Sequence, residues 1–136
     1  MMFKGYFDGA SRSNPGHASY GAVIYDQQTN EVLTDKKYIG VQTNNIAEYS
    51  GAISIIELCI QNNIDSIDIY GDSNLVIKQI TNQWKVKSDS IRPYYQKMKQ
   101  LLDSHTWKHI GFHHVKRKFN KRADALANEA LDETDY

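Results

Sequence analysis

Five short segments carry strand-like patterns of hydrophobic and polar residues, the clearest being the alternation at the start of the chain. The five segments are Met2–Phe7, Tyr20–Tyr25, Val32–Val41, Ile64–Tyr70 and Trp107–Val115. The polar run Asp26–Glu31 indicates a hairpin connection between the second and the third. Five strands are therefore expected, two of them joined by a tight turn.

A different periodicity runs from Ile46 to Ile60, where apolar residues recur three or four positions apart and predict an amphipathic helix. Three more helices are expected, one beginning near Asn74, one over Ile91–Leu102 and one over Ala123–Leu131. Strands that first follow one another and then alternate with helices favour a mixed sheet with helices on its faces. The pattern therefore predicts an α/β fold.

Composition adds expectations about organisation and location. A chain of 136 residues is long enough for one domain with a real core, so residues 1–136 are expected to form a single domain. The single cysteine, Cys59, excludes an internal disulfide and fits a reducing compartment. No apolar run has the length of a signal peptide or a membrane span. We expect a cytoplasmic protein with no membrane partner.

Charge is balanced overall but unevenly distributed. The net charge of zero argues mildly against a nucleic-acid partner, for which a basic footprint is the usual first sign. However, residues 108–122 contain six Lys or Arg and no acid, whereas residues 124–136 contain five acids and no Lys or Arg. The basic segment ends directly against Asp124, so it could hold a polyanion beside a carboxylate.

Four carboxylates lie at positions in the predicted fold where they could form a functional site. Asp8 and Asp72 each end a predicted strand, and carboxyl ends of neighbouring parallel strands border the ligand crevice of an open sheet. Glu48 lies on a helix row that is otherwise small or apolar, and Asp124 lies near the start of the last helix. Each has an ordinary alternative, namely a turn former, a helix cap or a partner of the helix dipole. Gathered together they would repel unless a cation held them, and an all-oxygen set suits Mg²⁺.

Four motifs contain these acids, and together they are specific. They are DGASRSNPG from Asp8, TNNIAEYSG around Glu48, GDSNLVI at Asp72, and HVKRKFNKRADALAN leading into Asp124. In this order and spacing the chain resembles the type 1 ribonuclease H family, from Phe3 to about Leu131. The resemblance implies the ribonuclease H-like fold, a five-stranded mixed sheet flanked by helices. It also implies an endoribonuclease that hydrolyses the RNA strand of RNA–DNA hybrids, leaving 5′-phosphate and 3′-hydroxyl ends.

The resemblance implies a role for each acid. Two Mg²⁺ ions, with Mn²⁺ as an alternative, would lie about 3.5–4 Å apart on either side of an in-line displacement. Asp8 would bridge both ions, Asp124 would help to hold the ion that activates water, and Glu48 and Asp72 would hold the other. His114 matches a histidine that assists proton movement or product release in the family.

Short polar residues near the acids are expected to bind the hybrid. The candidates are Ser11, Asn14, Thr43, Asn44, Asn45, Asn74, Ser88 and Asn120. In the family, the counterparts of Asn44, Asn74 and the Ser11 region approach ribose 2′-hydroxyls. Thr43 and Asn45, with Ser88, resemble a pocket for a phosphate of the DNA strand. One residue of Thr43–Asn45 is also expected to cap the helix, and Asn120 to hold its loop or cap the last helix.

The chain resembles a compact form of the family. The segment Gln83–Ser88 leads straight toward the helix at Ile91, which leaves no room for the basic protrusion of some members, and no N-terminal hybrid-binding module is evident. Because the net charge is also zero, we expect the protein to bind hybrids loosely and with steep salt sensitivity. Nothing in the sequence demands a dimer, and we expect a monomer. The small residues after Asp8 are expected to let the backbone approach a nucleic-acid strand.

Three other functions remain open from the residues alone. A catalytically weak hybrid-binding protein could share the fold, although all four acids are present. A related exonuclease or phosphatase usually needs Asp-x-Glu or Asp-x-Asp on the first strand, where Gly9 and Ala10 follow Asp8. A plain nucleotide-binding sheet would need a Gly-rich phosphate loop, and none is present.

Overall fold

A computed structural model describes the whole chain, Met1–Tyr136, and every predicted strand and helix is present. The elements are β1 (Phe3–Ser11), β2 (Gly16–Tyr25), β3 (Glu31–Gln42), α1 (Asn44–Gln61), β4 (Ser66–Gly71), α2 (Asn74–Ile80), α3 (Arg92–Asp103), β5 (His109–His114), the 3₁₀ turn η1 (Arg117–Phe119) and α4 (Lys121–Asp132). No helix has the length and apolarity that crossing a membrane requires.

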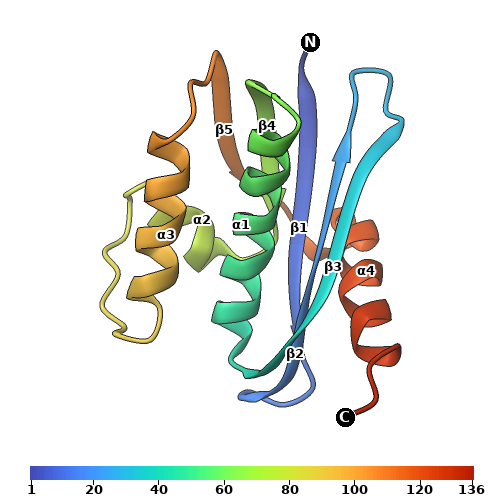
Figure 1. Cartoon of the computed structure of the whole chain (residues 1–136). Coiled ribbons are helices and arrows are strands. Elements are labelled where there is room, and N and C mark those ends of the chain that lie inside the picture. The colour runs from blue at the N-terminus through green and yellow to red at the C-terminus, as the bar shows by residue number, and fades with distance from the viewer.

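The strands form one mixed sheet in the order β3-β2-β1-β4-β5. β1 pairs antiparallel with β2, and β2 with β3, whereas β4 and β5 run parallel to β1. Helix α1 packs on one face of the sheet with α3 beside it, and α4 packs on β1, β2 and β3 (Figure 1). The prediction of a five-stranded mixed sheet flanked by helices is therefore confirmed.

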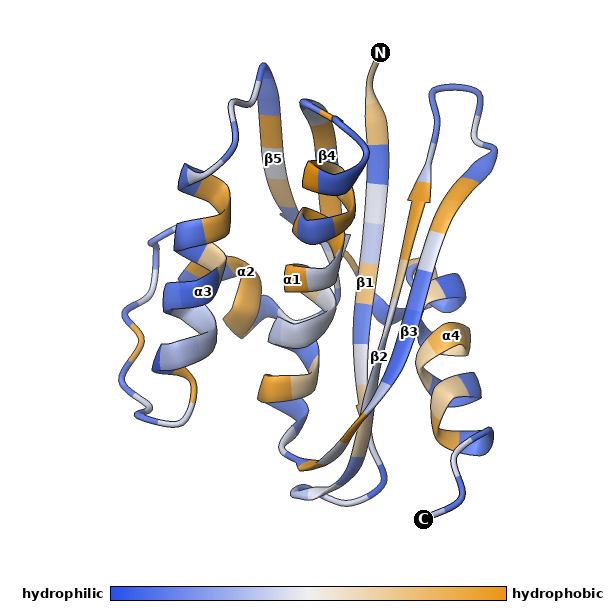
Figure 2. Ribbon diagram, in the orientation of Figure 1, coloured by the Kyte–Doolittle hydropathy of each residue, from blue (hydrophilic) through white to orange (hydrophobic).

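The core lies between α1 and the centre of the sheet. Phe7 of β1, Ile55 of α1 and Ile69 of β4 are completely buried there. Colouring by hydropathy shows hydrophobic positions along β4, β5 and α1, whereas the segment between α2 and α3 is mostly hydrophilic (Figure 2). That segment contains no helix, as expected for the compact form.

Strand β1 is longer than the sequence pattern indicates, so Asp8 does not end it. Antiparallel pairing with β2 continues to Ser11 opposite Ala18, because turn-forming residues begin only at Arg12. The parallel pairing with β4, in contrast, stops at Phe7 opposite Gly71. Asp8 is therefore the first β1 residue beyond the β4 ladder, which places it beside the residue that follows β4.

Gly9 allows a close contact within the protein that the sequence does not indicate. A Cβ atom at this position would lie 2.4 Å from the backbone nitrogen of Glu48 and 2.5 Å from the carbonyl carbon of Ala47. Glycine is required because β1 and the first turns of α1 touch at this point. Its small size thus admits a helix. The expectation that the small residues after Asp8 let the backbone approach a nucleic-acid strand stays a prediction.

Candidate metal centre

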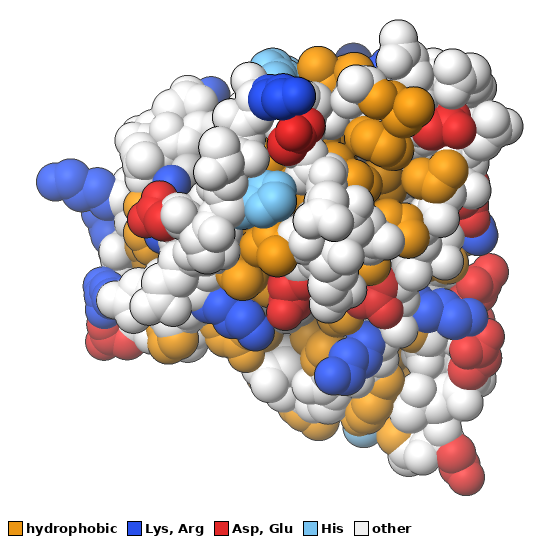
Figure 3. Space-filling view, turned by 45° about the horizontal axis from the view of Figure 1, so that its top comes forward, with side chains coloured by type: hydrophobic (Ala, Val, Ile, Leu, Met, Phe, Trp, Pro, Cys, Tyr) orange, Lys and Arg blue, Asp and Glu red, His pale blue; other side chains and the backbone are white.

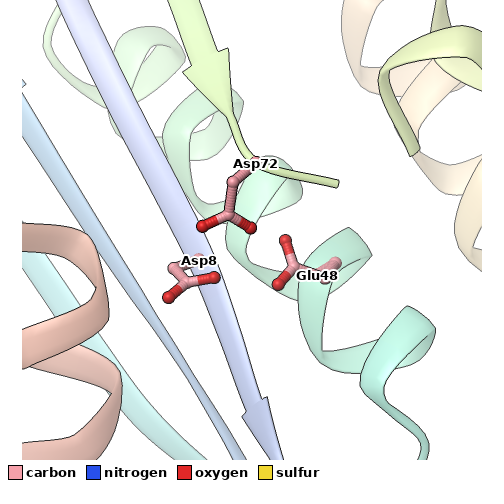
Figure 4. A group of neighbouring side chains, drawn as sticks. All are labelled: Asp8, Glu48 and Asp72. Carbon is pink, nitrogen blue, oxygen red and sulfur yellow. The ribbon is translucent and has the colours of Figure 1, made fainter. Parts of the chain in front are cut away.

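Three carboxylates from three different elements converge at the carboxyl end of β4. Asp8 projects from β1, Glu48 from α1, and Asp72 from the first position after β4 (Figure 4). Each offers an oxygen, and these three oxygens lie within 4.8 Å of one another. Strands β1 and β4 stop pairing after Phe7 and Gly71, and the three acids meet at this point.

Local structure fixes where Glu48 lies. Thr43 caps α1, because its hydroxyl accepts a hydrogen bond from the backbone nitrogen of Ile46 at 3.3 Å. The Gly9 backbone nitrogen donates to Glu48 Oε1 at 2.9 Å and to Asp8 Oδ1 at 3.0 Å. One peptide group thus holds both carboxylates in place, so the approach of α1 to β1 at Gly9 also aligns the two acids.

The cluster is buried and has an unsatisfied acceptor. Asp8 is 5% exposed and Glu48 is 7% exposed, and Glu48 Oε2 has no hydrogen-bond partner. Figure 4 shows the Glu48 oxygens directed toward Asp8 and Asp72. A buried acceptor left unpaired costs about 1–3 kcal/mol, and more when it carries charge. A cation between the three carboxylates would remove that cost.

Burial also sets the protonation of the acids. It raises the pKa of Asp8, and the nearby charges of Glu48 and Asp72 raise that pKa further. Burial raises the pKa of Glu48 as well, although hydrogen bonds from Asp8 and from the Gly9 backbone act in the opposite direction. Without a cation the pair therefore retains a proton at pH values where isolated carboxylic acids have lost theirs.

Asp124 stands at the rim of this cluster. It lies in the first turn of α4, is only partly buried, and is close enough to Asp8 to raise its pKa further. Asn128, one turn later, donates from Nδ2 to the Asp124 carbonyl at 3.0 Å and to Oδ1 at 3.3 Å. Sequence reasoning missed Asn128, whose signal is its spacing of four residues from Asp124 on one helix.

Comparison with known proteins places the four motifs in one family. The family model described as "Reverse transcriptase-like" matches residues 6–130. Ribonuclease H of Clostridium botulinum is 34% identical over 145 aligned residues, which cover 94% of each chain. The chain belongs to the type 1 ribonuclease H family. Ribonuclease HI of Halobacterium salinarum, a second relative, is 42% identical over 129 residues.

Solved structures of the ribonuclease H family superpose on nearly the whole chain. RNase H1 of Halobacterium salinarum gives a TM-score of 0.92 at 40% identity, covering 98% of this chain and 100% of that one. LC11-RNase H1, solved in complex with an RNA/DNA hybrid, gives 0.89 at 33% identity, covering 96% and 97%. The chain spans 63% of the length of the Halobacterium relative and 34% of a bifunctional relative from Mycobacterium tuberculosis.

Asn120 is a positioning residue in this member of the ribonuclease H family. It is 1% exposed, and its Nδ2 donates to the Phe7 carbonyl at 2.8 Å and to Asp72 Oδ2 at 3.3 Å. Because the side chain is enclosed, it cannot contact a duplex, and its inclusion among the substrate-binding residues is corrected. Its amide instead ties Asp72 to β1, and it makes no side-chain cap on α4.

His114, the last residue of β5, lies exposed beside the cluster. Its Nε2 is 3.2 Å from the Asp72 carbonyl oxygen. Since a carbonyl only accepts, Nε2 carries the hydrogen in this contact, and Nδ1 is the ring nitrogen left to exchange a proton. The remaining histidines bind elsewhere, with His109 and His113 each 2.8 Å from Asp68.

The polar residues predicted to bind the hybrid have two kinds of surroundings. Asn44, Asn45 and Asn74 are exposed at the starts of α1 and α2, close in sequence to Glu48 and Asp72. Asn14 is also exposed, but its side chain makes a hydrogen bond within the protein, in which Oδ1 accepts from the Asn44 backbone nitrogen at 3.1 Å. Asn14 therefore holds the β1–β2 turn against the start of α1.

The remaining two serines make local hydrogen bonds. The Ser11 hydroxyl donates to the Ser13 carbonyl within the β1–β2 turn. The Ser88 hydroxyl lies 2.9 Å from that of Ser90, in the segment before α3, and makes no hydrogen bond with Thr43 or Asn45. The phosphate pocket that combines Ser88 with Thr43 and Asn45 therefore stays a prediction.

Proposed function

We propose that this chain is an endoribonuclease that hydrolyses the RNA strand of RNA–DNA hybrids and leaves 5′-phosphate and 3′-hydroxyl ends. The observation that carries the proposal is the buried cluster of Asp8, Glu48 and Asp72, in which Glu48 Oε2 lacks a partner. Membership of the ribonuclease H family, and the hybrid bound by the similar LC11-RNase H1, support the choice of substrate.

The cofactor that fits is a pair of Mg²⁺ ions, with Mn²⁺ as the alternative. All the side-chain donors in the cluster are carboxylate oxygens, which hard divalent cations prefer. Asp8 would contact both ions, Asp124 would help to hold one, and Glu48 with Asp72 would hold the other. When bound, such ions supply a water of lowered pKa and stabilise the charge on the leaving oxygen.

Other groups of the protein position these acids and recognise the ribose of the RNA strand. The Gly9 backbone nitrogen holds Glu48 by a hydrogen bond, and the Asn120 amide holds Asp72 in the same way. The Asn44 and Asn74 amides, exposed beside the cluster, can each donate to and accept from a 2′-hydroxyl, the group that distinguishes RNA from DNA. His114, held through Nε2, would exchange a proton through Nδ1 near the reacting phosphate.

Matched duplexes test the proposal. Labelled RNA–DNA, RNA–RNA and DNA–DNA duplexes of one sequence are incubated with Mg²⁺, with Mn²⁺ and with a chelator. We expect internal cleavage of the RNA strand of the hybrid, with either metal and not with the chelator, and 3′-hydroxyl ends that a polymerase can extend. A protein that binds the hybrid but leaves it intact with both metals would be the catalytically weak binder.

A further inference from the structure

A cleft of about 470 Å³ lies on the α4 side of the sheet, outside the metal centre. Helix α4 runs along only the lower half of the sheet (Figure 1), and the cleft lies beyond its start. Tyr6 of β1 and Tyr25 of β2 line it, together with Thr29 of the β2–β3 turn and Phe119 of η1. The cleft is therefore bounded by a turn on one side and by the start of α4 on the other.

Aromatic rings continue from this cleft across four strands. The Tyr6 ring meets Tyr25 edge to face, with centroids 5.9 Å apart, and stacks on Tyr70 at 4.9 Å. His113 of β5 lies 5.0 Å beyond Tyr70. The three tyrosines are only partly buried, and Phe119 is 63% exposed. Partly exposed rings in a row provide surfaces on which nucleobases can stack.

The charge around the cleft favours an anion. Lys4, Lys118 and Lys121 line it, all three are exposed, and none forms an ion pair within the chain. Arg122 also lines the cleft but is engaged by an internal ion pair, and Asp26 is the one acid in the lining. The Lys118 ammonium lies over the Phe119 ring, 5.1 Å from its centroid, so Lys4 and Lys121 are the two ammonium groups without a partner in the chain. Ammonium groups beside aromatic rings fit the backbone and the bases of a nucleic acid.

The cleft lies next to the metal centre along β1, although none of the four acids lines it. Tyr6 precedes Asp8 by two residues on the same face of β1, a separation of about 6–7 Å along a strand. The lining also includes Asn120, whose buried amide does not face the cleft as a free group but contacts Asp72. A strand that leaves the acids along β1 would therefore arrive among the tyrosines and lysines.

We propose that this cleft binds a single-stranded continuation of the RNA strand whose hybrid portion lies at the four acids. The proposal rests on the proposed function for the identity of the strand. A single strand is favoured over a duplex because only unpaired bases offer their faces for stacking. The consequence is a preference for hybrids that carry a single-stranded RNA extension over blunt hybrids of the same sequence.

The test compares blunt hybrids with hybrids extended by an oligouridine tail at the 5′ or the 3′ end of the RNA. KM is measured in Mg²⁺, and binding of oligouridine alone is measured by fluorescence anisotropy with a chelator present. We expect a lower KM for one of the tailed hybrids. Tyr25→Ala should weaken oligouridine binding about tenfold, the loss of one stacked base, whereas Tyr25→Phe retains the binding.

Charge is tested with a matched pair. Lys4→Glu should weaken oligouridine binding and reduce its salt dependence, while Lys37→Glu, the same change on edge strand β3, should alter neither. All variants should cleave the blunt hybrid like the unaltered protein. Equal KM for blunt and tailed hybrids, or Tyr25→Ala binding oligouridine normally, overturns the inference while blunt-hybrid cleavage upholds the proposed function. Failure of every form to cleave any hybrid overturns the proposed function, whatever the oligouridine binding.

Discussion

At the level of single residues, the fold buries carboxylic acids that would be ionised and hydrated if they were exposed to water. Asp8 and Glu48 would each be ionised and hydrated in an unfolded chain, yet both are buried and share the Gly9 backbone nitrogen. Burial raises the pKa of both, so without metal the pair keeps a proton at neutral pH. Repulsion between the buried carboxylates destabilises the metal-free protein. A divalent cation relieves this repulsion, and the same repulsion therefore favours metal binding.

Replacing Asp8 with Asn should therefore have opposite effects on activity and on stability. Cleavage is lost because the residue proposed to contact both ions loses its charge. A group whose pKa is raised by folding favours the folded state at low pH, and this contribution is lost as pH rises. In a chelator, Asp8→Asn should therefore raise Tm at pH 7–8 and change it little near pH 4. Thermal unfolding across pH, with and without Mg²⁺, checks this; substantial cleavage by the folded variant would contradict the assignment.

His114→Ala should slow turnover without abolishing it. Its ring reaches the Asp72 carbonyl but none of the carboxylate oxygens, so the metal centre stays intact without it. Loss of a general acid–base group typically costs about 10²–10⁴-fold, and loss of help in product release costs less. Single-turnover and steady-state rates separate these two cases. A variant as inactive as Asp8→Asn would show that His114 is needed to build the site.

At the scale of elements, the site depends on how closely α1 approaches β1. Gly9→Ala places a methyl group 2.4 Å from the Glu48 backbone nitrogen, so helix and strand must separate. We expect a loss of about 1–3 kcal/mol in unfolding free energy, as for other overpacked sites, together with weaker Mg²⁺ binding. Gly5→Ala is the control, because its Cβ would meet only the Ile55 and Ile67 side chains. Denaturant unfolding and Mg²⁺ titration of both variants measure the difference; unchanged Mg²⁺ affinity in Gly9→Ala would contradict the role given to this contact.

The element scale is also where sequence reasoning succeeded and failed. Periodicity predicted each strand and helix because it reports one buried face, a local property. The motifs identified Glu48 and Asp72, which the structure places together. The length of β1 beyond Asp8 and the burial of Asn120 were missed, because they depend on pairing with β2 and on contacts with Phe7 and Asp72. Such contacts join segments far apart in sequence, so no local pattern reports them.

The starts of α1 and α2 carry the proposed discrimination between RNA and DNA. Replacing Asn44 and Asn74 together with Ala removes two amides that would pair with 2′-hydroxyls, a net loss of about 1–3 kcal/mol for each group left unpaired. We expect slower hybrid cleavage and a smaller difference between hybrid and DNA duplex, with unchanged metal dependence. Measuring the cleavage of the hybrid and of the DNA duplex over a Mg²⁺ titration gives the rate, the selectivity and the metal dependence. Unaltered selectivity would show that RNA is recognised elsewhere.

At the scale of the whole molecule, charge limits how tightly a hybrid can bind. The net charge is zero, and acidic and basic side chains are interspersed on the face seen in Figure 3. Affinity for a polyanion then rests on a few local contacts, such as those of the basic segment before Asp124. Each contact with a phosphate releases counterions, so binding weakens with salt in proportion to the number of contacts.

KM for the hybrid should therefore rise steeply with salt while kcat changes little. With about two or three phosphate contacts, raising NaCl from about 50 to about 200 mM should raise KM about ten- to fortyfold. Salt should affect the buried acids, and therefore kcat, much less, because buried charges are screened far less than exposed ones. Steady-state kinetics at fixed Mg²⁺ across this range give both quantities, with a neutral osmolyte as the control. A KM independent of salt would mean that the hybrid is held by uncharged contacts, and a fall in kcat alone would place the effect at the metal centre.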